Sequence, residues 1–159
     1  MSGRLVLAGT LATLLAVAAN VILSIVLRAA VDPSGIFQPL NVGSVALLTA
    51  FGAIAATFVY EYIVARSEDP RGRFIRVAVI ALLLSFVPDL ALLAGVGPGQ
   101  NADVPRVLAL MSMHVVAAVI IVSVLITLGP QRSNALPAKT ASAKTDDGST
   151  DGGASDSSV

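Results

Sequence analysis

The chain has 159 residues, of which 55% are hydrophobic and only 13% are charged, and its mean hydropathy is +0.85. This composition lies far from that of soluble domains and indicates a single membrane-embedded unit. Acidic and basic side chains cancel, no basic stripe is interleaved with aromatic residues, and cysteine is absent. Nucleic-acid binding, disulfide scaffolds, thiolate metal sites and cysteine nucleophiles are therefore excluded.

Four long apolar stretches dominate the chain, and each is long enough to cross a bilayer as a helix. A helix rises about 1.5 Å per residue, so about 20 residues span the roughly 30 Å of hydrocarbon. The stretches lack the alternation that barrel strands require. We therefore predict an all-α polytopic membrane protein, an antiparallel four-transmembrane-helix bundle in residues 1–129. The expected spans are residues 5–27, 42–65, 74–96 and 107–128.

The first stretch raises the question of a secretory signal peptide. Residues 16–18 read Ala-Val-Ala, which fits a cleavage site. However, the apolar run continues to Leu27, which is too long for the apolar core of such a peptide. We therefore expect this stretch to be retained as a helix.

Basic residues gather at one end of the predicted spans. The loop between the second and third spans is rich in arginine, and Arg4 and Arg132 lie on the same side. The opposite side has Arg28 and Arg106, each close to an aspartate. Because basic loops stay in the cytoplasm, we expect a cell-membrane protein with both termini inside. The charges expected at the cytoplasmic interface are Glu61, Arg66, Arg71, Arg73 and Arg76.

The segments outside the spans are rich in turn-forming residues. Residues 32–35 and 97–101 are clusters of Pro, Gly, Asp, Ser, Gln and Asn. Phe37 and the two tyrosines at the end of the second span suit the membrane interface. Residues 130–159 are dominated by small and polar types, so we expect a disordered cytoplasmic tail there.

One polar residue in each of three spans lies at a similar depth. Counted from the outer ends of the spans, Asn20, Asp89 and His114 all lie about 10–12 Å below the edge. Ser85 precedes Asp89 by four residues, so both side chains project from one helix face. An ionisable residue is costly in hydrocarbon and usually has a partner or a task. We expect these four residues to form an intramembrane polar cluster in which His114 is the partner of Asp89.

Two further features are expected to shape the bundle. Pro88 has no N–H, so the carbonyl of Leu84 loses its helical donor, which predicts a kink in the third helix. The second helix carries small residues that permit close helix packing, namely Gly52, Ala53 and Ala56.

Two interpretations of Asp89 and His114 remain open. In the structural interpretation, an interhelical hydrogen bond or ion pair fixes the register of the helices. In the functional interpretation, the pair binds a proton, an ion or a polar substrate group, since histidine can change its charge near neutral pH. No second carboxylate lies at this depth, which favours the structural interpretation.

Enzyme signatures are missing from the sequence. It contains no His-Glu-x-x-His, no Gly-x-Ser-x-Gly and no phosphate-binding Gly-x-x-x-x-Gly-Lys. Ser112 and His114 are two residues apart on a helix and point in different directions, so they are not a nucleophile and its base. We therefore expect no catalytic activity, no metal and no cofactor.

Two short motifs carry a resemblance to a known family. They are Ser-Phe-Val-Pro-Asp-Leu at residues 85–90 and Met-Ser-Met-His-Val-Val-Ala-Ala at residues 111–118. Together they resemble a prokaryotic family of small four-span membrane proteins that is described as a domain of unknown function. The resemblance covers about residues 5–128. It implies four helices, a family-typical aspartate and a Met-x-His motif, and it implies no activity, substrate or ligand.

The sequence therefore favours an integral membrane protein with a structural or partner-interaction role in the cytoplasmic membrane. Its expected partners are the lipid bilayer and either further copies of the chain or another membrane protein. The alternative is a small oligomeric transporter coupled to protons or ions through Asp89 and His114.

Overall fold

A computed structural model of the protein describes residues 3–95 and 102–130, and within these residues it is helical without any strand. All four long helices are long and apolar enough to cross a membrane. The prediction of an all-α, four-span membrane protein is thereby confirmed. The turn expected at residues 97–101 and residues 131–159 of the expected tail lie outside the described residues. The elements are α1 (Gly3–Val31), η1 (Gln38–Leu40), α2 (Val42–Arg66), α3 (Pro70–Leu93) and α4 (Val104–Leu128).

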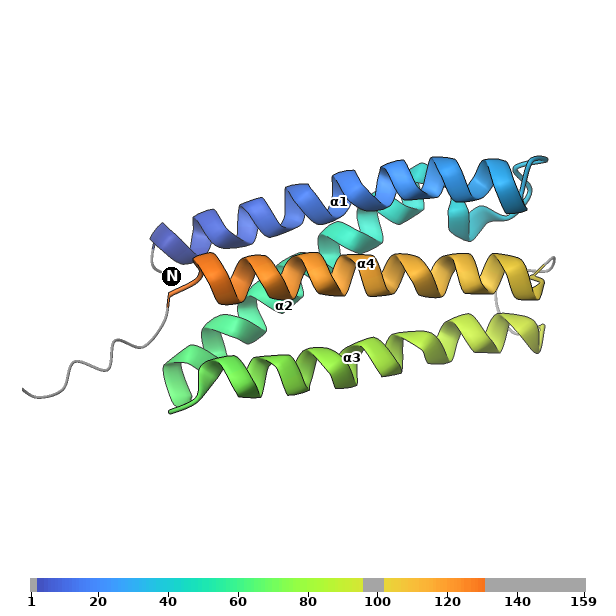
Figure 1. The fold of residues 1–159 in the computed structure, drawn as a ribbon. Helices are drawn as coiled ribbons and strands as arrows, with labels where there is room; N and C mark the ends of the chain where they lie inside the picture. Colours follow the sequence, from blue (N-terminus) through green and yellow to red (C-terminus); the bar gives the residue numbers. More distant parts are fainter. Residues whose placement is uncertain (1–2, 96–101, 131–159) are drawn as a thin grey trace, which may run out of the picture.

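The long helices run antiparallel in chain order (Figure 1). α1, α4 and α3 form one layer with α4 in the middle, and α2 crosses behind this layer diagonally. α2 begins beside α1 and ends beside α3. We call the end with the α2–α3 connection the arginine end and the opposite end, with residues 32–41, the far end. The start of α1 and the end of α4 both lie at the arginine end.

Aspartate caps set the starts of α3 and α4. The side chain of Asp69 accepts a hydrogen bond from the N–H of Gly72, and that of Asp103 accepts one from the N–H of Arg106. Such caps satisfy the free N–H groups of a first helical turn. α3 and α4 therefore begin at Pro70 and Val104, before the predicted positions 74 and 107. The prediction followed continuous apolar runs, and prolines and arginines interrupt these first turns.

α1 and α2 pack closely against each other at Gly9. A Cβ atom added to Gly9 would lie 2.6 Å from Cγ2 of Thr57. The hydroxyl of Thr57 donates to the carbonyl of Ala53 at 2.8 Å, which holds that side chain in place. The missing side chain at Gly9 thus allows the two backbones to approach each other. The buried face of α1 is a stripe of mostly small residues: Leu5, Ala8, Gly9, Ala12, Ala16, Asn20 and Ser24.

The small residues predicted to pack α2 behave differently from one another. Ala53 is fully buried, and Ala56 packs partly buried against the same core. Gly52, in contrast to the prediction, makes no close helix contact, because no atom lies within 4 Å of an added Cβ. Open space therefore lies beside this glycine.

Gly9 and Gly52 therefore offer a matched pair of substitutions. We expect Gly9→Ala to lower the free energy of unfolding by about 1–2 kcal/mol, because the new methyl group overlaps Thr57. We expect Gly52→Ala to leave it unchanged or to raise it by up to about 1 kcal/mol, because alanine favours the helix. Reversible unfolding by SDS in mixed micelles measures both values. Equal effects of the two substitutions would contradict the packing described.

α3 is held to the bundle near its two ends. Phe74 and Asp89 are its only buried residues among those described. The ring of Phe74 packs edge-on against that of Tyr60, with the centroids 4.9 Å apart. α3 continues through Pro88 to Leu93, and the kink expected at Pro88 stays a prediction.

Tyr60 lies in the protein core at the end of α2, so its ring does not face the lipid. Only 2% of its surface is exposed, and its hydroxyl donates to the carbonyl of Pro130 at 3.3 Å. A Cβ atom on Gly129 would overlap the Tyr60 ring. Tyr60 thus joins the ends of α2 and α4 to the start of α3.

Candidate functional site: a polar pair beside a membrane groove

Asp89 and His114 meet between α3 and α4. Nδ1 of His114 lies 3.3 Å from Oδ2 of Asp89. The side chain of Asp89 is only 9% exposed, whereas that of His114 is 40% exposed. The Phe86 ring stands edge-on to the imidazole at a centroid distance of 6.5 Å. The carboxylate is thus hidden in the protein while the imidazole faces outward.

The contacts of Nδ1 determine which ring nitrogen of His114 can form a hydrogen bond with a further group. Nδ1 also lies 2.9 Å from the carbonyl oxygen of Leu110, one turn earlier in α4. A carbonyl oxygen only accepts hydrogen bonds, so Nδ1 must carry the proton. Asp89 on the same side favours that tautomer. Nε2 is therefore the nitrogen that is free to accept a hydrogen bond, or to donate one when the ring is charged.

The other two members of the expected polar cluster make separate contacts. Nδ2 of Asn20 donates to the hydroxyl of Thr49 on α2 at 3.0 Å. The hydroxyl of Ser85 donates to the carbonyl of Leu82 at 2.7 Å, within α3. No hydrogen bond between described residues joins either side chain to Asp89 or His114. The predicted cluster is therefore one close carboxylate–imidazole contact with two polar neighbours.

A groove, which we call the α2 groove, runs along α2 past His114. Its far part is a cavity of about 160 Å³ between α1, α2 and α4. Its second part is a cavity of about 340 Å³ between α2, α3 and α4. Gly52, His114 and Ile121 line both parts, so the two meet beside the imidazole. The residues of α2 that line it recur at helical spacing: Val45, Leu48, Thr49, Gly52, Ala55, Ala56 and Val59.

The walls of the α2 groove are almost entirely apolar. Among the described residues that line it, only Asn20, Thr49, Ser85 and His114 have polar side chains. None of them is an acid, a lysine or an arginine. His114 is therefore the one group on these walls that can change its charge.

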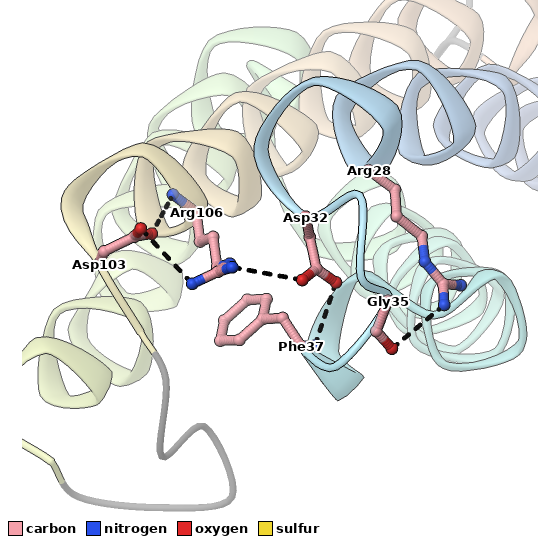
Figure 2. A network of polar contacts seen from close by, with 6 residues as sticks. All are labelled: Arg28, Asp32, Gly35, Phe37, Asp103 and Arg106. Carbon is pink, nitrogen blue, oxygen red and sulfur yellow. Dashed lines mark hydrogen bonds and ion pairs between the residues drawn. The ribbon is translucent and has the colours of Figure 1, made fainter.

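A second polar network ties the loop after α1 to the start of α4 (Figure 2). Asp32 is fully buried, and its Oδ1 lies 3.3 Å from Nη2 of Arg106. Its Oδ2 accepts a hydrogen bond from the N–H of Phe37 at 3.0 Å. Arg106 also reaches the exposed Asp103 at 3.4 Å. One buried carboxylate thus fixes both the loop and the neighbouring helix.

The same loop buries an aromatic residue that was expected at the membrane interface. Phe37 is only 2% exposed and packs with Leu40 and Leu110. The guanidinium of Arg106 lies over its ring at 5.9 Å from the centroid. The carboxylate of Asp32 accepts a hydrogen bond from the backbone N–H of Phe37, which fixes the backbone at this position. The ring therefore packs against the protein and does not face the lipid.

At the arginine end, the expected interface charges lie on the last turns of α2 and the first turns of α3. The guanidinium of Arg66 stacks over the exposed ring of Tyr62 at 4.3 Å from its centroid. Glu61 lies on the same part of α2. The remaining arginines of this set, all on α3, are Arg71, Arg73 and Arg76.

Sequence reasoning missed the contacts of Asp32 and Thr49. Asp32 and Arg106 are 74 residues apart, and nothing local joins them. The available signal was their shared place at the far ends of two spans, where opposite charges outside the hydrocarbon can meet. Thr49 gave no signal, because a threonine in an apolar span normally bonds its own helix.

The chemistry that this arrangement offers is hydrogen bonding and proton exchange at Nε2 of His114. In the described part of the chain, no three side chains capable of binding a metal gather in one place. The apolar groove passes the imidazole, and Asp89 contacts the ring from the buried side.

Comparison with known proteins gives one match. The model of a family described as "Family of unknown function (DUF6069)" matches residues 1–129. No curated protein and no solved structure matches the chain.

Proposed function

The chain belongs to DUF6069, a family of unknown function, and we propose that it is a non-catalytic membrane protein that binds a membrane-resident partner in the α2 groove. The match agrees with the resemblance drawn from the two sequence motifs. The observation that carries the proposal is the position of His114, which is 40% exposed at the junction of the two cavities.

A purely structural role accounts for Asp89 but not for His114. A pair that only fixes helix register is best buried on both sides, because a polar group facing hydrocarbon without a hydrogen bond costs free energy. Asp89 meets this condition, since its side chain is 9% exposed. The outward-facing imidazole gains a hydrogen bond only when something polar enters the groove. This difference favours binding over structural support alone.

A small oligomeric carrier coupled to protons or ions is the second candidate. It is favoured by the buried carboxylate of Asp89, which lies 3.3 Å from Nδ1 of His114. In a carrier, Asp89→Asn would leave the fold intact and abolish substrate movement. In a binding protein, the same substitution would leave occupancy of the groove largely intact, because Nε2 remains in place.

We further propose that the protein lies in the cytoplasmic membrane with the arginine end inside. The positive-inside rule supports this orientation, because the arginines of α2 and α3 crowd that end. At the far end, Arg106 is paired with Asp32 and Asp103. Both the first and the last described residues lie at the arginine end.

Single-cysteine photocrosslinking tests the binding function, since the natural chain has no cysteine. Ala81→Cys places a benzophenone-maleimide probe in the groove, and Leu83→Cys places it at similar depth on the lipid-facing side of α3. After irradiation in native membranes, we expect a defined adduct from position 81 that position 83 does not give. An adduct of twice the chain mass would identify a second copy, and a larger protein another membrane protein. The same lipid mixture at both positions would refute the proposal.

A further inference from the structure

We propose that the occupant of the α2 groove is a neutral lipophilic alcohol or phenol, an apolar molecule whose hydroxyl group bonds Nε2 of His114. This inference rests on the proposed binding function and names the chemical class of the ligand. Three features of the groove carry it: its size, the absence of charge on its walls, and the space opposite His114.

The size of the groove suits a small molecule. The α2 residues that line it run from Val45 to Val59, which corresponds to about 21 Å. The cavities hold about 160 and 340 Å³. Volumes of about 300–1,000 Å³ are usual for pockets that bind small molecules.

The walls exclude charged head groups. A phosphate or carboxylate would find no arginine or lysine among the described residues that line the groove. A quaternary ammonium would find no carboxylate there either, because Asp89 is buried behind His114 and does not line the groove. A charge brought into such surroundings without a partner is strongly unfavourable. The ligand is therefore neutral.

A hydroxyl group matches His114 in both of its protonation states. The proton on Nδ1 is engaged by the carbonyl of Leu110 and faces Asp89. Neutral imidazole accepts a hydrogen bond at Nε2, and charged imidazole donates one there. A hydroxyl can do either, whereas an ether or ketone only accepts.

Gly52 provides the space for that hydroxyl. Gly52 lines both cavities together with His114, and an added Cβ would meet no atom within 4 Å. A large side chain at this position would fill the junction beside the imidazole. Gly52→Leu is therefore expected to block the site, and Phe51→Leu is a matched control on the lipid-facing side of the same helix.

The single histidine of the chain makes a direct measurement possible. Protein labelled with ¹⁵N-histidine and carrying no histidine tag is placed in lipid nanodiscs and titrated with 1-decanol. The comparison compound is 1-methoxynonane, which has a similar length and no hydroxyl proton. We expect a saturable shift of the Nε2 resonance with decanol, while Nδ1 stays protonated. The ether should bind about fivefold more weakly at equal mole fraction in the lipid, which corresponds to the loss of one hydrogen bond.

The variants and the crosslinking distinguish a wrong ligand class from a wrong binding function. Gly52→Leu should abolish the saturable shift, and Phe51→Leu should preserve it. Equal shifts with decanol and ether, or shifts that never saturate, would overturn the inference even if Gly52→Leu does not fold. A protein adduct at position 81 would also overturn it while leaving the binding function in place. Identical adducts at positions 81 and 83 would overturn the binding function itself.

Discussion

Asp32→Ala is expected to lower the free energy of unfolding by about 3 kcal/mol or more, because it removes the buried carboxylate that faces Arg106. Asp32 is fully buried and bonds both Nη2 of Arg106 and the N–H of Phe37. Its loss would leave that N–H without its acceptor and the guanidinium without its buried counter-charge. Reversible unfolding by SDS in mixed micelles measures the change.

Asp103→Asn is the matched control for Asp32→Ala. Asp103 also contacts Arg106, but its side chain is 53% exposed. Asparagine keeps an oxygen that can cap α4, so only the exposed ion pair is lost. Such pairs contribute about 0.2–1 kcal/mol. An effect of Asp32→Ala no larger than that of Asp103→Asn would show that the buried network does not hold the far end together.

His114→Ala is expected to lower the free energy of unfolding by about 2 kcal/mol, because it leaves the buried carboxyl of Asp89 without its partner. Asp89→Asn should cost less, about 1 kcal/mol, because a buried neutral amide needs no counter-charge. The double substitution should cost less than the sum of the two. Coupling energies between contacting polar groups inside membrane proteins average about 0.6 kcal/mol and reach about 1.7 kcal/mol.

Ser85→Ala serves as the control for this pair. Ser85 lies one turn before Asp89, but its hydroxyl donates to the carbonyl of Leu82 within its own helix. We expect its removal to change the free energy of unfolding by less than about 0.5 kcal/mol. Additive effects of the Asp89 and His114 substitutions would mean that the two side chains do not interact, despite their 3.3 Å separation.

The four helices could be predicted from the sequence, whereas their first turns could not be located by hydropathy. Continuous apolar runs of membrane length leave the backbone no alternative to the helix. The true starts at Pro70 and Val104 depend on Asp69 and Asp103, whose polarity places them outside any apolar run. Reading the capping residues together with the prolines would have recovered both starts.

The candidate site was only partly accessible to sequence reasoning. Counting residues from the ends of the spans predicted that Asp89 and His114 lie at the same depth in the membrane. The structure has the two side chains in contact. Asn20 lies at that level too, but it faces Thr49, because depth does not specify rotation about the helix axis. Gly52 was assigned to packing for its small size, whereas the structure places it beside open space that lines both cavities.

The contact between Asp32 and Arg106 also bears on how the protein is synthesised. The two residues are separated by 74 positions, and they join the first helix to the last. At about 5–20 residues per second, a ribosome needs roughly 4–15 s to pass from one to the other. Throughout that interval the aspartate of the nascent chain has no arginine to meet. The far end of the bundle is therefore closed only after the fourth helix emerges, whereas α1 and α2 can already pack against each other before then.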